Sequence, residues 1–169
     1  MPPEECFSIQ IGRGMGEKHL PAHTWLERIL NRETIMNTLT ANDIDFLKKK
    51  AKQLRRMILD MLHLAGSGHP GGSMSAVEIL TLLYYRELRV DSSLPECPDR
   101  DRFILSKGHA CPLLYAILAD KGFFPQSELK TFRQFHSILQ GHPDKNKVPG
   151  VEISSGSLGM GISFGIGTS

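Results

Sequence analysis

The sequence is short of net charge, of cysteine and of long apolar runs. A formal charge of +2 over 169 residues is too small to predict nucleic acid as a partner. The longest apolar stretches, such as residues 82–85, are far shorter than the roughly 20 residues that span a bilayer, so no membrane partner is expected. Three cysteines without a CxxC pair favour a reducing compartment, and the acidic start lacks a signal-peptide pattern. Together these absences predict a cytoplasmic protein.

The first 35 residues differ from the rest of the chain. They contain GRGMG at positions 12–16, scattered polar residues and little periodicity. A glycine-rich phosphate loop normally follows a strand, and no strand pattern precedes this one. Met36 opens a stretch that resembles a natural protein start. We therefore expect residues 1–35 to be a flexible leader or extension, and residues 36–169 to form the folded domain.

Helical patterns dominate from residue 40 onward. Apolar residues recur at steps of three and four between Ile44 and Ala65, after a capping signal at 40–43 and before a stop at Gly66. The opposite face of this helix is rich in lysine and arginine. That composition is typical of a solvated face, and a phosphate-binding patch is the alternative.

Three further helices are predicted. The first runs from the S-x-x-E capping pattern at Ser75–Glu78 to about Leu88 and, being apolar on nearly every side, is expected to be buried. The second covers 112–121, with a proline in its first turn and a glycine after its last. The third is short and follows Pro125, with apolar residues on one side: Leu129, Phe132 and Phe135.

Only two short stretches are typical of strands. Phe103–Leu105 is a short apolar run, and the segment that begins at Val151 indicates a strand end before a glycine-rich turn and a helix. Two short strands cannot form a stable sheet alone. The order of elements therefore suggests that the chain ends before its main sheet is complete.

Three of the seven histidines share one local context. His69 lies in SGHPGG, His109 in SKGHA and His142 in QGHPD, each directly after a glycine. Glycine allows a tight turn or a close approach to a ligand, and imidazole can donate, accept or carry charge near neutral pH. If the loops converge, they form a pocket suited to a hydroxylated, anionic ligand. Ordinary turns are the alternative, and zinc is disfavoured because the histidines lack the short spacing of common sites.

The loop that follows residue 153 carries a second phosphate signal. Ser154 or Ser155 can cap a helix whose first turns hold three glycines, Gly156, Gly159 and Gly161, so that free N–H groups face an anion such as diphosphate. Close helix packing through small residues explains these glycines equally well. The pattern is neither GxGxxG nor GxxxxGK[ST], so it predicts no nucleotide site of either kind.

Four segments in this order carry a family resemblance: SGHPGGSMSAVEIL, DRDRFILSKGHA, LQGHPD and GVEISSGSLGMGIS. They resemble the N-terminal part of transketolases, from about Met36 to the end of the chain, and above all the split transketolases whose N-terminal half is a separate polypeptide. The resemblance implies an α/β class: a partial thiamine-diphosphate-binding fold, helix-rich, with the parallel sheet incomplete because the chain ends early.

The resemblance also implies an enzyme that transfers a two-carbon ketol unit between sugar phosphates with thiamine diphosphate. It makes His69, His142 and His109 candidate catalytic residues. His69 and His142 would contact the donor's hydroxyl and carbonyl oxygens and assist proton transfers. His109 would lie near the cofactor diphosphate and the substrate. The backbone groups of Gly156 and Leu158 would line the cofactor.

Mg²⁺ and a partner chain are implied as well. The family's metal motif, GDG with a downstream asparagine, is absent, so no metal ligand is predicted in this sequence. A C-terminal transketolase subunit would supply the pyrimidine-binding half, with a dimeric or heterotetrameric assembly.

We therefore expect a truncated chain that is inactive alone. One alternative is another thiamine-diphosphate enzyme, such as a deoxyxylulose-phosphate synthase or a dehydrogenase component. The other is a non-catalytic remnant that only binds a partner chain.

Overall fold

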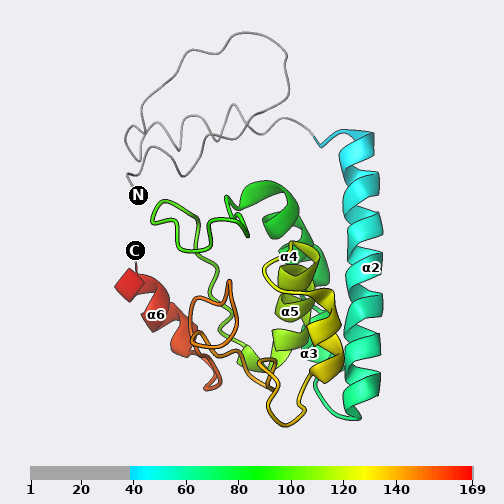
Figure 1. The fold of residues 1–169 in the computed structure, drawn as a ribbon. Helices are drawn as coiled ribbons and strands as arrows, with labels where there is room; N and C mark the ends of the chain where they lie inside the picture. The colour runs from blue at the N-terminus through cyan, green and yellow to red at the C-terminus, as the bar shows by residue number, and fades with distance from the viewer. Residues whose placement is uncertain (1–38, 169) are drawn as a thin grey trace.

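The computed structural model describes residues 39–168 (Figure 1). The predicted leader at 1–35, with its GRGMG, lies outside the described residues. The described part is helical, with no strand among residues 39–168. Its elements in order are α2 (Ala41–Ala65), α3 (Pro70–Met74), α4 (Val77–Leu82), the π-helical turn η2 (Leu83–Glu87), the 3₁₀ turn η3 (Gly108–Ala110), α5 (Cys111–Asp120), the 3₁₀ helix η4 (Gln126–Thr131) and α6 (Met160–Thr168).

Helix α2 begins and ends where the sequence predicts. The Asp43 amide donates to the Thr40 hydroxyl at 3.2 Å, and the Thr40 amide donates to the Asp43 carboxylate at 3.0 Å, so each residue satisfies a free donor of the other. Gly66 ends the helix in the left-handed conformation, with φ +60°, which costs glycine little. The helix buries Ala51, Leu54, Ile58 and Met61, which lie on one face as their spacing requires.

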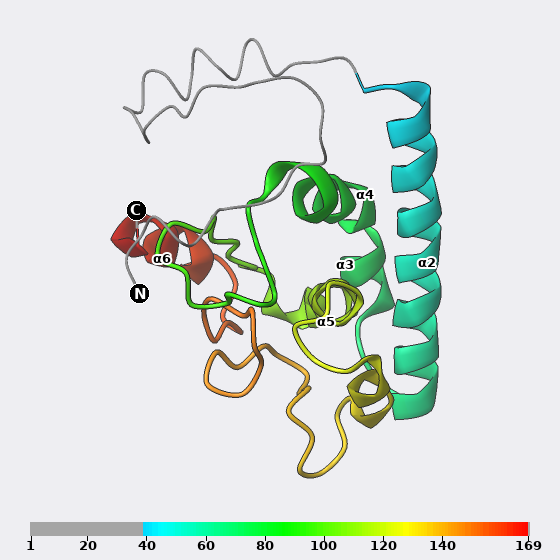
Figure 2. The same ribbon diagram turned by 45° about the horizontal axis from the view of Figure 1, so that its top comes forward.

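Helix α5 lies at the centre of the core. Every residue from Cys111 to Ala119 is buried, as expected for a short helix that is apolar all round. Figures 1 and 2 show α2 running the length of one side of the molecule, with α3, α4 and α5 packed beside it. The predicted ends of α5 are confirmed: Pro112 lies in the first turn, and the Gly122 amide donates to the Ala119 carbonyl at 3.1 Å.

Asp120, the last residue of α5, joins three elements. Its carboxylate accepts hydrogen bonds from Lys50 at 2.6 Å, from Gln53 at 2.8 Å and from the Tyr85 hydroxyl. The Asp120 side chain is only 5% exposed. Burial alone would raise the pKa of this carboxyl, but the hydrogen bonds from Lys50 and Tyr85 outweigh it and lower the pKa below its ordinary value.

The prediction for the helix after residue 75 is wrong in two respects. The Ser75–Glu78 pair forms no capping box: α4 begins at Val77 without a side-chain cap, Ser75 bonds to the Gly72 carbonyl, and Glu78 pairs with Arg55 of α2. The helix is also not buried on all sides, since Ile79 is 63% exposed. The reason is that α4 packs against α2 on one side only and continues as a π-helical turn.

Three local predictions also fail. Phe103–Leu105 is no strand, because no other described segment pairs with it; instead Leu105 is buried, and the Phe103 ring packs edge-on against Tyr84. Phe135 is 90% exposed because η4 ends at Thr131 and the chain then turns outward. The serines at 154 and 155 do not cap α6, which begins only at Met160. A helix-rich fold is confirmed, whereas the incomplete parallel sheet stays a prediction.

No helix between residues 39 and 168 combines the length and the apolar character that crossing a bilayer requires.

The hydrogen bonds of the Asp120 carboxylate lead to a prediction about stability. Asp120→Asn should lower the free energy of unfolding at pH 7 by about 1–3 kcal/mol, because the charge-assisted bonds from Lys50 and Tyr85 become neutral or are lost. The pKa of Asp120 is lower in the folded than in the unfolded chain, so this stabilisation is complete above about pH 4 and is lost as the pH falls through the folded-state value. Denaturant unfolding over a pH series should therefore show the two proteins converging at acid pH.

The matched control for this experiment is Asp60→Asn, since Asp60 lies on the exposed side of α2. That substitution should leave stability nearly unchanged at every pH. The role given to Asp120 would be contradicted if both variants lost the same free energy of unfolding, or if the stability difference between Asp120→Asn and the unmodified protein persisted at acid pH.

Candidate functional site

His69 and His109 meet at the start of α3. His69 precedes Pro70, the first residue of that helix, and its carbonyl accepts from the Ser73 amide at 3.4 Å and from the Ser73 hydroxyl at 3.2 Å. The His69 and His109 rings contact edge-to-face, with centroids 5.4 Å apart and an interplanar angle of 67°. Two of the three predicted histidines, 40 positions apart in the sequence, therefore lie side by side.

Glycine makes this approach possible. A Cβ atom on Gly72 would lie 2.9 Å from Nε2 of His109, closer than ordinary van der Waals contact. A Cβ atom on the neighbouring Gly71 would meet nothing within 4 Å. The close contact with His109 therefore requires glycine at position 72 and not at position 71.

Lys107 holds the same loop from the other side. Its ammonium donates to the Gly72 carbonyl at 2.7 Å and to the Ser75 hydroxyl at 3.0 Å. Lys107 thus fixes the SGHPGG loop against the SKGHA loop. No role for Lys107 was predicted from the sequence, although its position two residues before His109 in the same motif could have indicated one.

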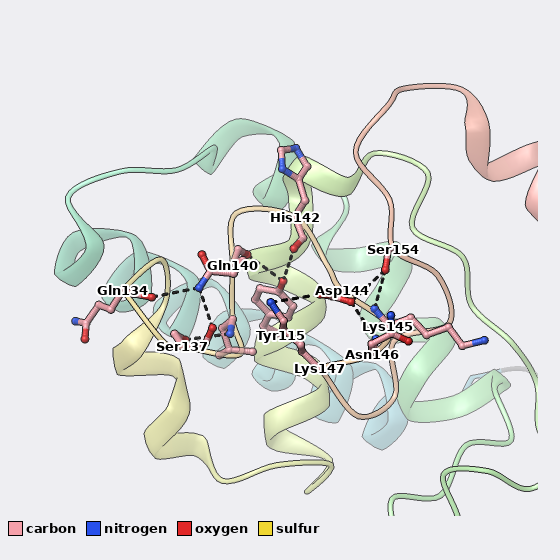
Figure 3. A network of polar contacts seen from close by, with 11 residues as sticks. Tyr115, Gln134, Ser137, Gln140, His142, Asp144, Lys145, Asn146, Lys147 and Ser154 are labelled. Atoms are coloured by element: carbon pink, nitrogen blue, oxygen red, sulfur yellow. Dashed lines mark hydrogen bonds and ion pairs between the residues drawn. The ribbon is translucent and has the colours of Figure 1, made fainter.

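The QGHPD loop is held by two buried donors of α5, Tyr115 and Cys111, of which Figure 3 shows Tyr115. The Tyr115 hydroxyl lies 3.0 Å from the carbonyl oxygen of Gln140 and 3.1 Å from that of His142, and it donates to this pair. The Cys111 thiol donates to the Gly141 carbonyl at 3.1 Å. Burial raises the pKa of the Cys111 thiol to about 12 and raises the pKa of Tyr115 as well, so both groups keep their protons at neutral pH. Figure 3 shows the His142 ring pointing away from Tyr115 while its carbonyl points toward it.

Arg133 supports this loop on its far side. A Cβ atom on Gly141 would lie 2.8 Å from Nη2 of Arg133, so the guanidinium packs directly over the glycine. The Arg133 amide donates to the Leu139 carbonyl at 2.8 Å, and the residue adopts φ +62°, which is uncommon outside glycine. Sequence analysis missed Arg133, since nothing local in FRQFHS distinguishes it from a surface arginine.

A turn at Asp144 ties the QGHPD loop to the segment that precedes α6. The Asp144 carboxylate accepts from the Asn146 amide at 3.0 Å and from the Ser154 hydroxyl at 3.3 Å, and the Lys145 amide donates to Ser154 at 3.0 Å (Figure 3). The hydrogen bond from the Asn146 backbone is the largest of the effects that lower the pKa of Asp144, so the carboxylate stays ionised. Ser154 is therefore a link between loops and not a helix cap.

The last loop completes the arrangement around Gly156. A Cβ atom on Gly156 would come within 3.6 Å of the His142 ring, and one on Gly108 would lie 2.7 Å from the Ser155 carbonyl oxygen. The His142 loop and the SKGHA loop therefore both contact this last loop. Gly156 is exposed and Leu158 is 68% exposed. Of the three glycines predicted in the first turns of a helix, only Gly161 lies in α6, where its amide donates to the Ser106 hydroxyl at 3.2 Å.

Glu152 anchors the entry to this loop through an ion pair with Arg100 at 2.9 Å and a second with Arg102 at 3.4 Å. The side chains of Glu152 and Arg100 are 10% and 12% exposed. A pair this enclosed fixes the backbone shortly before Gly156.

The contacts give a continuous chain of loops. The SGHPGG loop touches SKGHA through His69 and Gly72, SKGHA touches the last loop through Gly108, and that loop touches QGHPD through Gly156. The loops that carry the three imidazoles, the Lys107 ammonium group and exposed glycine backbone are thus joined by contacts, and these groups are of the kind that binds an anionic, oxygen-rich ligand. No group of three or more His, Cys, Asp or Glu side chains that could hold a metal ion occurs within residues 39–168.

Comparisons with known proteins confirm the family resemblance that the sequence motifs indicate. A family model described as "Transketolase, thiamine diphosphate binding domain" matches residues 47–169. The chain is 43% identical over 125 residues to the plasmid transketolase of Cupriavidus necator, covering 73% of this chain and 19% of that protein. It is 41% identical over 121 residues to the 6-deoxy-6-sulfo-D-fructose transketolase subunit SqwG of a Clostridium species, covering 72% of this chain and 44% of the subunit.

A solved structure agrees as well. Transketolase from Leishmania mexicana superposes with a TM-score of 0.67 and 37% identity, over 72% of this chain and 18% of that protein. The chain therefore spans about a fifth of the full-length relatives and under half of the subunit.

The glycine pair at 71 and 72 gives a test of the site geometry. Gly72→Ala should displace the His109 ring, because its methyl group would occupy the space next to Nε2. The expected result is a shift of the His69 and His109 imidazole signals in a proton–nitrogen NMR spectrum, with little loss of stability since the ring can rotate away. Gly71→Ala, the control, should leave both signals in place. Identical spectra for the two variants would contradict the observed packing.

Proposed function

Because the chain belongs to the transketolase family, we propose that it carries the thiamine-diphosphate side of an active site for ketol transfer between sugar phosphates. The observation that supports this most directly is the contact of His69 with His109, together with the last loop, which touches SKGHA at Gly108 and His142 at Gly156. Residues 36–169 are assigned to the diphosphate-binding domain, and residues 1–35 to an extension. A C-terminal transketolase subunit would complete the site, as the subunit naming of the 41%-identical relative suggests, in a dimeric or heterotetrameric assembly.

The residues around Gly156 fit the cofactor. The exposed backbone at Gly156 and Leu158 can face thiamine diphosphate, with His142 against the glycine. The Ser155 hydroxyl is buried and has no hydrogen-bond partner within residues 39–168, so it is a donor available to this loop's ligand. When bound, thiamine diphosphate supplies the electron sink for breaking and forming the carbon–carbon bond.

The three histidines are given distinct roles. His69 and His142 are exposed at the loop surfaces, where they can bind the hydroxyl and carbonyl oxygens of a ketose donor and move protons to and from them. His109 is partly buried between Gly72 and the last loop, which suits a contact with the cofactor diphosphate and with the substrate. Lys107 and Tyr115 act through the backbone and are positioning residues.

Mg²⁺ does not fit the described residues. They offer no group of three or more His, Cys, Asp or Glu side chains that could hold a metal ion. No role is given to Mg²⁺ among these residues, and it enters the activity assay as a component of the medium.

Ketol transfer should require His69. Mixed with a C-terminal transketolase subunit, thiamine diphosphate and Mg²⁺, the chain should transfer a ketol unit, whereas the chain alone should be inactive. His69→Ala should reduce the rate by about 10²–10⁴-fold, the usual contribution of a group that transfers protons. The measurement is a coupled assay of aldose-phosphate release from a ketose phosphate.

His63→Ala is the matched control, since His63 is exposed near the end of α2 and outside the three loops. It should keep full activity. If the mixture showed neither ketol transfer nor binding of thiamine diphosphate, the non-catalytic remnant would be favoured instead.

A further inference from the structure

A groove separate from the histidine loops runs between α2 and α4. Its volume is about 500 Å³, and its apolar wall consists largely of residues from the first half of α2 and the end of α4: Leu39, Ile44, Leu47, Ala51 and Leu82. Its charged lining residues are Lys48, Lys52, Arg55 and Glu78. It shares no residue with the candidate functional site.

Several wall residues are left in contact with solvent by the described part of the chain. Leu39 is 40% exposed, Ile44 38% and Leu82 37%. An apolar groove with charged edges is typical of a surface that another segment covers. The location of the groove indicates which segment that is, because Leu39, the first described residue, is part of the wall. The chain before Leu39 is therefore joined covalently to a residue of the wall.

The N-terminal segment has a suitable sequence near its end. Thr24 and Glu27 have the T-x-x-E spacing typical of a helix start. The stretch after Thr24 contains four large apolar residues with the spacing of one helix face: Trp25, Leu26, Ile29 and Leu30. The family match begins only at residue 47, so this pattern is not explained by the fold shared with the relatives.

The connection is long enough for this segment to reach the groove. Residues 34–38, which connect the segment to Leu39, can span about 16–18 Å when extended. Along α2 the distance from Leu39 to the level of Ala51 is about 18 Å, at 1.5 Å per residue. The segment can therefore fold back and lie along the whole groove.

Charge agrees with this placement. Lys48 and Lys52 are exposed at the groove edge, and no carboxylate of residues 39–168 forms an ion pair with either. Glu27 and Glu33 lie within and just after the apolar stretch and can supply such partners, and the same stretch carries Arg28 and Arg32. An apolar face flanked by charges of both signs fits an apolar groove that is lined by lysines and by Glu78.

We propose that residues 24–33 dock in the groove between α2 and α4 of the same chain, with Trp25 and Ile29 against its apolar wall. The segment thereby covers apolar surface that the described core leaves open. This proposal does not depend on the proposed function, since the groove contains none of the three histidines.

Trp25 is the only tryptophan of the chain and therefore a direct probe of docking. In the full chain its emission should be blue-shifted and protected from acrylamide quenching. Ile44→Glu and Leu82→Glu, each placing a charge in the groove wall, should shift the emission to the red and abolish the protection. Circular dichroism shows whether each variant is folded. If one variant fails to fold, the exposure of Trp25 is judged from the other.

Leu59→Glu is the matched control, because Leu59 is a 55% exposed residue of α2 outside the groove. It should leave Trp25 protected. Solvent-exposed Trp25 in the unmodified chain, or protection unchanged by both groove variants, would overturn the proposal. Protection that disappears on dilution together with self-association would also overturn it, in favour of a second copy of the chain as the occupant.

Discussion

The site depends on hydrogen bonds that the buried helix α5 donates to the backbone of the QGHPD loop. Tyr115 and Cys111 are one helical turn apart, and their donors reach three successive carbonyl oxygens, those of Gln140, Gly141 and His142. Carbonyls held in this way cannot rotate without leaving a buried donor unpaired, which costs about 1–3 kcal/mol for each group. The direction of the His142 side chain is thus fixed from inside the core, through main-chain atoms.

The same helix also positions the other loops. Its N-terminus continues directly from η3, which contains Gly108 and His109, so the SKGHA loop cannot move independently of the core. Lys107 joins the SGHPGG loop to it through a hydrogen bond to the Gly72 carbonyl. Asp144 joins the QGHPD loop to the segment before Gly156 through a hydrogen bond from Ser154, and its bond from the Asn146 amide holds its own turn in place. Four segments distant in sequence therefore share one rigid support. A proposed role in orienting a cofactor and a sugar phosphate requires such preorganisation.

Local signals in the sequence predicted the parts of the fold that local physics controls. The Thr40–Asp43 cap, the stop at Gly66 and the proline and glycine at the ends of α5 need only neighbouring residues to form, and all were predicted correctly. The capping of α4 was misjudged because Glu78 pairs with Arg55, which is distant in sequence. Phe103–Leu105 is apolar enough for a strand but has no pairing partner in the described chain, and pairing is a non-local property.

The residues of the candidate site divide in the same way. The histidines were identified because glycine beside histidine is a local pattern, and the contact of His69 with His109 agrees with the expected convergence. Arg133 and Tyr115 could not be identified because their significance lies in which carbonyl or glycine each one touches after folding. The groove beside α2 also depends on tertiary packing, since its wall combines residues about 40 positions apart.

The close contact between Gly108 and Ser155 constrains both residues. A β-carbon at position 108 would lie 2.7 Å from the carbonyl oxygen of Ser155 and 2.8 Å from its hydroxyl oxygen, so position 108 has no room for a side chain. Position 155 contributes its side chain as well as its main chain to this contact. A larger side chain at either position would therefore push the last loop away from the SKGHA loop. The width of the site is thus set by a pair of small residues, and substitutions that leave it unchanged have to fall elsewhere in these loops.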